Sequence, residues 1–208
     1  MGSNRRSENN PLFIVIDGGD GCGKDTQVKL IARYYLNKGM KVRIRSHPSI
    51  DNPFGRYAKS ALEEGGKKGH LKAAVFYAVD VIRSLVKYYR HNGNEVIIFS
   101  RYLLGVCYLP SPIVIFGYNF FQSFLPTSRY FFFLDVTPEV ARKRISKRGE
   151  KQEMFEGLSR LKKMRGKMQS VTKRKSWFQI NGDGSPSKVW YQIRQILVQL
   201  DSETIRGL

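Results

Sequence analysis

A glycine-rich segment that ends in a lysine lies near the start of the chain. It reads Gly18-Gly19-Asp20-Gly21-Cys22-Gly23-Lys24-Asp25-Thr26 and contains the G-x-x-x-x-G-K spacing of a P-loop. Glycines allow backbone N–H groups to point at phosphate oxygens, and a helix that starts there adds partial positive charge. Lys24 would bind the outer phosphates. The segment therefore predicts binding of nucleotide phosphates, with a chance glycine-rich turn as the alternative.

The elements that position this loop alternate between strands and helices. The apolar run Leu12–Asp17 predicts a strand buried on both faces of a parallel sheet, and Gln27–Leu36 has the apolar spacing of a helix. Further strands are predicted at Lys41–Ser46, Val96–Ser100, Tyr130–Val136 and Trp177–Asn181. Further helices are predicted at Gly55–Glu63, at Leu71–His91, from Pro138 through Arg144 into a basic stretch, and at Pro186–Leu200. Gly65–Gly69 has the composition of a surface loop.

This alternation predicts the fold class. Five short strands separated by helices are typical of a three-layer α/β/α P-loop fold with a five-stranded parallel sheet. Ligands of such folds bind at the carboxyl ends of the strands, so Asp17, Ser46, Ser100 and Asp135 are expected near one crevice. We expect a single domain over residues 11–203, preceded by a disordered tail of residues 1–10.

Composition limits the class of protein. Of the 208 residues, 41% are hydrophobic, which is enough to bury the core of one domain. The apolar runs are shorter than the roughly 20 residues of a membrane span, and the first residues lack the apolar centre of a secretory signal. Two cysteines, Cys22 and Cys107, are too few for a disulfide framework. We therefore expect a cytoplasmic protein without a membrane partner.

Positive charge is concentrated in one part of the chain. The sequence has 36 Lys and Arg residues against 17 Asp and Glu, a formal net charge of +19. Much of this excess lies between Ala141 and Lys175. Such a field attracts polyanions, whether nucleotide phosphates, nucleic acid or an anionic membrane surface, and a solvated helix face is the alternative interpretation.

Three segments of the chain resemble the thymidylate kinase family of nucleoside monophosphate kinases. They are Phe13–Gln27 (FIVIDGGDGCGKDTQ), Arg101-Tyr102 after the third predicted strand, and Tyr130–Glu150 (YFFFLDVTPEVARKRISKRGE). The resemblance implies a transferase of nucleotide biosynthesis that moves the γ-phosphoryl group of ATP onto dTMP to give dTDP. It also implies Mg²⁺ as cofactor, a small helical lid over about residues 144–156, and a homodimer formed through the long helices.

The resemblance also implies roles for individual positions. Catalytic roles fall on Lys24, Arg101, Arg144, Arg148 and Asp20. ATP-binding roles fall on Gly18, Asp20, Gly21, Cys22, Gly23, Lys24, Asp25 and Thr26. Acceptor-binding roles fall on Asp20, Arg45, His47, Tyr77, Arg101 and Tyr108. Transfer of this kind depends on neutralising and aligning charge, and the cations of the lid would contribute to both.

Two departures from the family pattern concern the metal. Asp25 stands where a P-loop has a Ser or Thr hydroxyl for Mg²⁺, and Ser100 stands where the family's D-R-Y run has its aspartate. One hypothesis is an exchange, with carboxylate and hydroxyl both present as metal ligands but in swapped places. The alternatives are that metal binding has been lost, or that Thr26 supplies the hydroxyl.

Further departures concern the acceptor. Arg45-Ser46-His47-Pro48 replaces the family's R-E-P run, and Val81 stands where an arginine binds the base. Tyr77 fits the stacking aromatic residue but is also consistent with the core of an amphipathic helix. Tyr108 is shifted from the family's tyrosine. The three histidines, His47 among them, lack the spacing of a metal site and are expected at the surface or in loops.

Two other functions therefore stay open beside a dTMP kinase. The first is a kinase for a different nucleotide or nucleoside, since a pocket that loses a hydrogen bond to its base discriminates less well. The second is a catalytically degenerate nucleotide-binding protein with a basic face that binds nucleic acid, favoured by Asp25, Ser100 and the net charge.

Overall fold

The computed structural model describes residues 11–64, 66–89, 95–147, 157–173 and 176–206. The tail expected at residues 1–10 and residues 148–156 of the expected lid lie outside this part of the chain.

All five predicted strands are confirmed, and each boundary lies within one residue of its prediction. They are β1 (Leu12–Gly18), β2 (Lys41–Ser46), β3 (Glu95–Ser100), β4 (Tyr130–Asp135) and β5 (Phe178–Asn181). Neighbouring strands pair in parallel in the order β2-β3-β1-β4-β5. The carboxyl ends of β1, β3 and β4 therefore lie side by side at one edge of the sheet, as the crevice rule requires.

Helices connect the strands and cover the sheet. The described helices are α1 (Lys24–Leu36), α2 (Pro53–Glu64), α3 (Gly66–Tyr88), α4 (Ser111–Phe124), α5 (Pro138–Ser146), α6 (Leu158–Thr172) and α7 (Pro186–Arg206), with a 3₁₀ helix at Leu104–Tyr108. Among the described residues, no helix combines the length and the apolar character needed to cross a membrane.

The structure differs from the sequence-based expectation in three places. The loop expected at Gly65–Gly69 is wrong, because α3 already begins at Gly66. The first turn of α3 packs closely on α2 and needs a glycine at position 69, since a Cβ atom there would lie 2.8 Å from the Ala61 carbonyl oxygen of α2. The helix predicted to run from Pro138 into the basic stretch is two helices, α5 and α6, and α4 was not predicted.

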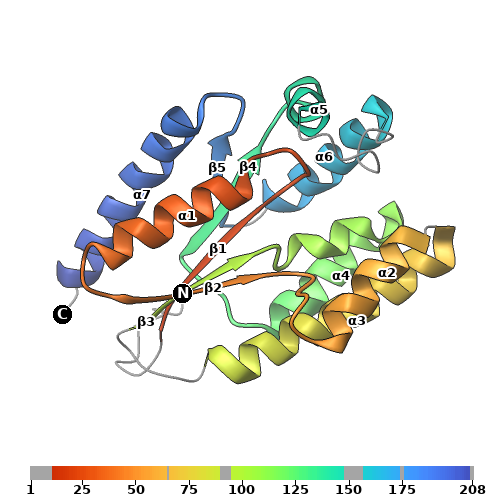
Figure 1. Ribbon diagram of the computed structural model, residues 1–208, viewed down its shortest axis with the longest axis horizontal. Coiled ribbons are helices and arrows are strands. Elements are labelled where there is room, and N and C mark those ends of the chain that lie inside the picture. The colour runs from red at the N-terminus through yellow and green to blue at the C-terminus, as the bar shows by residue number, and fades with distance from the viewer. Residues whose placement is uncertain (1–10, 65, 90–94, 148–156, 174–175, 207–208) are drawn as a thin grey trace.

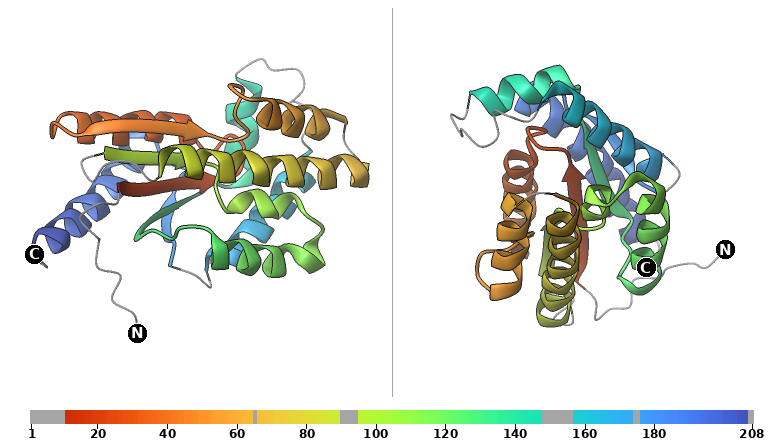
Figure 2. Two further views of the ribbon diagram at one scale, coloured as in Figure 1. Left: turned by 90° about the horizontal axis from the view of Figure 1, so that it is seen from below. Right: turned by 90° about the vertical axis from the view of Figure 1, so that its right-hand side faces the viewer.

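Alternate side chains of β1 build two cores on opposite faces of the sheet. Ile14 and Ile16 pack with residues of α1, α5 and α7, whereas Phe13 and Val15 pack with residues of α3, α4 and α6. Figures 1 and 2 show the resulting layers, with α2 lying alongside α3. The three-layer α/β/α fold with a five-stranded parallel sheet is thus confirmed.

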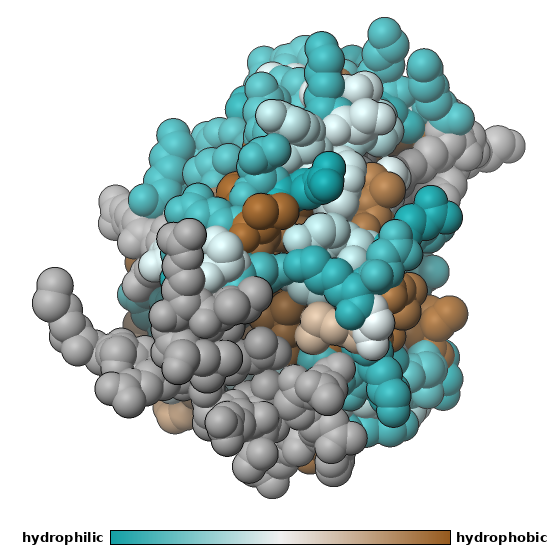
Figure 3. Space-filling view, turned by 90° about the vertical axis from the view of Figure 1, so that its left-hand side faces the viewer, coloured by the Kyte–Doolittle hydropathy of each residue, from teal (hydrophilic) through white to brown (hydrophobic). Residues whose placement is uncertain are grey.

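The end of the sheet where β1 begins lies opposite the glycine-rich loop. At the end seen in Figure 3, where β1 begins, the described surface is mostly hydrophilic with small hydrophobic groups between. The glycine-rich loop lies at the other end, after the last residue of β1.

Candidate active site

The glycine-rich segment forms a turn between β1 and α1. Gly21 has φ +74°, and a Cβ atom there would lie 2.7 Å from the Ala141 carbonyl oxygen of α5. This close approach requires glycine at position 21, which has both the conformational freedom and the missing side chain. Lys24 is the first residue of α1 and only 4% exposed; its Nζ donates to the carbonyl oxygens of Gly18 (2.9 Å) and Gly19 (2.8 Å). The predicted strand-turn-helix context of a P-loop is therefore present, with its lysine held inside the loop.

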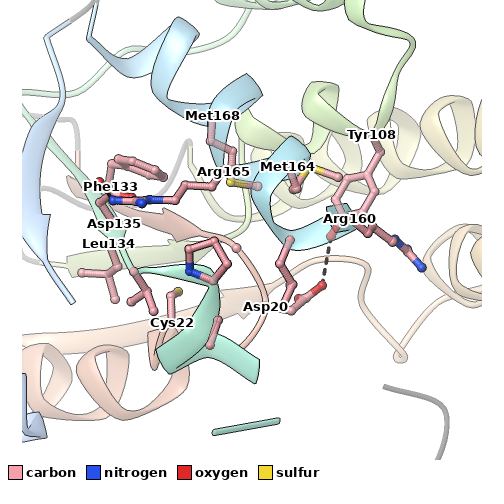
Figure 4. Close-up of a pocket in the computed structure, with 15 residues that line it drawn as sticks. Asp20, Cys22, Tyr108, Phe133, Leu134, Asp135, Arg160, Met164, Arg165 and Met168 are labelled. Atoms are coloured by element: carbon pink, nitrogen blue, oxygen red, sulfur yellow. Dashed lines mark hydrogen bonds and ion pairs between the residues drawn. The ribbon is translucent and has the colours of Figure 1, made fainter. Parts of the chain in front are cut away.

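Three of the predicted site residues meet beside this loop. The Arg101 Nη2 atom lies 3.4 Å from Asp20 Oδ1, and the Tyr108 hydroxyl donates to Asp20 Oδ2 at 3.4 Å, the contact dashed in Figure 4. Burial opposes ionisation of Asp20, but the positive charges of Lys24 and Arg101 outweigh it and lower the pKa of this carboxyl group. Asp20 is therefore an anion at neutral pH that accepts hydrogen bonds between two cations.

A pocket opens between the P-loop, the end of β4 and α6 (Figure 4). Figure 4 shows Asp20, Tyr108 and Arg160 at one end of its lining and Phe133, Leu134 and Asp135 at the other. The pocket therefore lies at the carboxyl end of the central strands, where a P-loop fold binds its ligands.

Asp17 connects the two walls of the site. It is 2% exposed, and its carboxylate accepts from the backbone N–H groups of Gly18 (2.9 Å), Tyr102 (2.9 Å) and Leu104 (3.2 Å). Burial raises the pKa of Asp17, and the three N–H donors and Lys24 oppose that rise. The sequence predicted that Asp17 lies near the crevice but gave it no role. The feature that could have indicated a role is a carboxylate at the end of an otherwise apolar strand.

Arg45 and His47, both predicted to bind the acceptor, are occupied with other protein groups. Arg45 makes two hydrogen bonds to the Asp51 carboxylate, at 2.8 and 3.0 Å. His47 is fully buried, and burial lowers its pKa to about 4. His47 lies in the loop after β2, one of the two expected places for the histidines, but it is not at the surface, because its ring packs 4.9 Å from that of Phe99.

Tyr77 contacts the backbone of the residue that follows Arg101. Its hydroxyl donates to the Tyr102 carbonyl oxygen at 3.1 Å, and its ring rests on Gly105, where a Cβ atom would lie 2.4 Å from it. Tyr77 is half-buried, so it joins the wall behind Arg101 rather than the deep core. Val81, one turn further along α3, is 2% exposed and belongs to the core.

Arg144 holds backbone rather than lining the pocket. Its guanidinium donates to the carbonyl oxygens of Gly21 and Cys22 in the P-loop, both at 3.5 Å, and to those of Asp183 (3.3 Å) and Gly184 (2.8 Å). It thereby joins the P-loop to the turn between β5 and α7. Arg148, the other predicted lid cation, lies outside the described residues.

Part of the basic stretch also has partners inside the protein. Arg165 binds both oxygens of Asp135, at 2.7 and 3.0 Å, and so fastens α6 to the end of β4. Lys167 donates to the carbonyl oxygens of Cys107 (3.1 Å) and Leu109 (2.6 Å). These two cations bind other groups of the protein, so they are not free to bind nucleic acid.

The two candidate metal ligands differ in exposure. Ser100 is 1% exposed, and its Oγ atom is buried without a hydrogen-bond partner among the described residues. Asp25 is exposed in the first turn of α1, and its charge is near enough to help raise the pKa of the Arg101 guanidinium. Since Mg²⁺ prefers carboxylate and hydroxyl oxygens, an unpaired buried hydroxyl fits such an ion. The described part of the chain has no group of three or more His, Cys, Asp or Glu residues that could hold a metal alone.

Comparison with known proteins places this site in a family. A family model described as thymidylate kinase matches residues 16–193. The chain is similar to the probable thymidylate kinase of Thermococcus kodakarensis, with 34% identity over 101 residues, 44% of this chain and 49% of that protein. The matched segment thus spans about half the length of this relative. The thymidylate kinase of Desulfotalea psychrophila is 28% identical over 162 residues, 75% of this chain and 80% of the relative.

A solved structure has the same fold. Thymidylate kinase from Candida albicans matches with a TM-score of 0.71 at 16% identity, over 92% of this chain and 93% of that one. A likeness at this identity supports the P-loop α/β/α fold described above. Because the family model extends over most of the described sequence, from β1 into α7, the chain belongs to the thymidylate kinase family.

Proposed function

We propose that the protein is an ATP-dependent nucleoside monophosphate kinase that transfers the γ-phosphoryl group of ATP to dTMP and forms dTDP. One observation supports this most: the P-loop with Lys24 lies beside the Asp20–Arg101 ion pair at the carboxyl end of the central strands. In a chain of the thymidylate kinase family, this arrangement offers cations to both the donor and the acceptor phosphates.

Each residue of the site has a role in this proposal. The backbone N–H groups of residues 21–26 and the start of α1 bind the ATP phosphates, and Lys24 neutralises the outer ones. Arg101 binds the phosphoryl groups from the opposite wall, while Asp20 holds its guanidinium and accepts from the acceptor nucleotide. Arg144 keeps the P-loop in place through its carbonyl groups. Catalysis then follows from alignment and charge neutralisation, because phosphoryl transfer needs little covalent assistance.

Mg²⁺ would be held by Asp25 together with the Ser100 hydroxyl, with the exposed Thr26 hydroxyl as the alternative to one of them. Such an ion, when bound, neutralises charge on the phosphate oxygens. The residues present fit this role, since they supply one carboxylate and one unpaired hydroxyl.

The acceptor is tested by measuring ADP formation from ATP and Mg²⁺ with dTMP, dUMP, UMP, CMP, GMP and AMP in turn. We expect the fastest turnover with dTMP, and a smaller preference over CMP than a pocket with a base-binding arginine would give. Such an arginine would donate to the thymine O4 atom, where cytosine has an amino group. Here Val81 stands at the arginine position and is buried in the core, and Arg45 is paired with Asp51, so neither donates to a base. Turnover with a different acceptor, and not with dTMP, would support phosphoryl transfer but show that dTMP is not the substrate. ATP binding without any acceptor-dependent turnover would contradict the proposal.

We also propose a homodimer formed through α3. An exposed apolar stripe runs along this helix at spacings of three and four residues, and consists of Leu71, Val75, Val79, Ile82 and Val86. The stripe is about 22 Å long at 1.5 Å per residue, and a second copy of the same helix could cover it symmetrically.

Substitution of Val75, which is 56% exposed, tests the dimer. We expect Val75→Asp to convert a dimer into a monomer in sedimentation equilibrium, because an unpaired carboxylate would be buried at the interface. Ser202→Asp is the matched control, since it adds the same charge at an exposed position of α7, on the other face of the sheet. A wild-type monomer, or a Val75→Asp variant that stays dimeric, would contradict this interface.

A further inference from the structure

Arg101 has an unusual backbone conformation. Its φ angle is 60°, the left-handed region that residues with a side chain rarely adopt. Among the described residues, Arg101 is the only non-glycine residue with a positive φ angle. Its guanidinium is also the group that pairs with Asp20. Contacts must therefore stabilise the backbone at this position, because the direction of the side chain depends on it.

The peptide group that follows Arg101 is bound on both sides. The Arg101 carbonyl oxygen lies 3.2 Å from His47 Nδ1, and the Tyr102 N–H donates to Asp17 Oδ2 at 2.9 Å. The Arg101 N–H itself donates to the Ile16 carbonyl oxygen at 3.4 Å. Both side chains that bind this peptide group are buried, so water does not compete with them.

The hydrogen-bond partners of His47 determine its tautomer. A carbonyl oxygen can only accept, so Nδ1 must bear the proton that binds the Arg101 carbonyl group. Nε2 is then an acceptor, and the Ser84 hydroxyl lies 2.9 Å from it as the donor. Ser84 in turn accepts from Arg45 Nη2 at 3.3 Å, and Arg45 is held by Asp51. The chain of donors therefore runs from Arg45 through Ser84 and His47 to the Arg101 carbonyl oxygen.

Burial supports the neutral ring that this chain requires. His47 is fully buried, and the loss of hydration outweighs the nearby Asp80 carboxylate, so its pKa falls to about 4. At neutral pH the ring thus has one proton, and the hydrogen-bond partners place it on Nδ1.

We propose that His47 is a positioning residue for phosphoryl transfer: through its Nδ1–H it holds the Arg101 carbonyl group, and so aims the Arg101 guanidinium across the site toward Asp20. The inference rests on the proposed kinase function, because Arg101 binds the phosphoryl groups in it. It gives a role to a residue that sequence comparison assigned to acceptor binding, although its ring is closed off from the pocket.

Two substitutions separate this role from simple filling of space. The Asn side-chain amide reaches the place of Nδ1 and can still donate to the Arg101 carbonyl group, whereas the Gln amide reaches the place of Nε2 and serves only Ser84. We expect His47→Asn to keep kcat within about threefold of wild type and His47→Gln to lower it about tenfold or more, in line with a misplaced catalytic group. The KM values for ATP and dTMP should change less than kcat, since Arg101 acts mainly in the transition state.

A double-mutant cycle with Arg101→Lys shows whether His47 acts through Arg101. In that background the two His47 variants should have the same kcat, because the side chain that they aim is gone. Thermal unfolding of every variant identifies any loss of kcat that comes from unfolding. If one variant fails to fold, Ser84→Ala replaces it; we expect it to lower kcat, since it removes the donor to Nε2.

The outcomes separate the two proposals. A wild-type protein without acceptor-dependent turnover overturns the kinase function, and the positioning role with it. Two results would overturn the positioning role alone, in a wild-type protein that is an active kinase. One is an equal loss of kcat in His47→Asn and His47→Gln. The other is a difference in kcat between these two variants that persists in the Arg101→Lys background.

Discussion

Replacing Lys24 by methionine is expected to lower kcat for phosphoryl transfer by about a hundred- to a thousand-fold, the usual loss for one preorganised charge at a transition state. Methionine keeps most of the length and apolar contact of the lysine stem but has no charge and no donor. The buried Nζ atom of Lys24 now lies between the carbonyl oxygens of Gly18 and Gly19, 2.9 and 2.8 Å away. Those acceptors belong to the start of the loop, so the lysine that is proposed to bind the outer phosphates is held inside it.

The fold should tolerate this change, because methionine keeps the apolar contacts of the lysine stem, but the buried Gly18 carbonyl oxygen loses a donor and this lowers the stability somewhat. Lys29→Met is the matched control: it makes the same substitution in the same helix at an exposed position. We expect the control to keep wild-type kcat and the wild-type unfolding midpoint, and Lys24→Met to stay folded with a slightly lower midpoint. A folded Lys24→Met variant with wild-type kcat would contradict the assignment of the P-loop as the catalytic phosphate site.

The strands could be predicted because burial leaves a clear signal in their composition. The central strands β1, β3 and β4 are buried on both faces and are continuous apolar runs, while β2 lies at the edge and alternates. Helix α4 gave no such signal. Its residues are apolar on nearly all sides, and Phe116 and Phe124 are more than 70% exposed, so the helical period is hidden.

The site was predictable where its residues follow one another in the chain. The P-loop, Asp20 among its residues, lies within one turn, and Arg101 comes directly after a strand whose carboxyl end had to face the crevice. The contacts of Asp17 and His47 were not predictable in this way, since they bind the backbone at Tyr102 and Arg101, 85 and 54 residues away in the sequence. Only the folded chain shows that both support the same peptide group.

Substitutions at the two candidate metal positions, Asp25 and Ser100, are expected to have the second large effect on kcat. Either single substitution, Asp25→Ser or Ser100→Asp, should lower kcat by at least about tenfold, as losses of metal-site groups do. Asp25→Ser leaves two hydroxyls and no carboxylate for Mg²⁺. Ser100→Asp places a second carboxylate where the structure has a buried, unpaired hydroxyl, and so adds negative charge beside the phosphates.

The double variant Asp25→Ser with Ser100→Asp should recover most of the activity that each single change removes, because it again has one carboxylate and one hydroxyl. Recovery should also appear in the Mg²⁺ concentration that gives half of the maximal rate, which each single variant raises. Thr26→Val separates the remaining alternative, since it abolishes activity only if the exposed Thr26 hydroxyl binds the ion. A folded but inactive double variant would refute the exchange. Activity that is indifferent to Mg²⁺ in the wild type would indicate instead that the site works without the metal, through the charges of Lys24 and Arg101 alone.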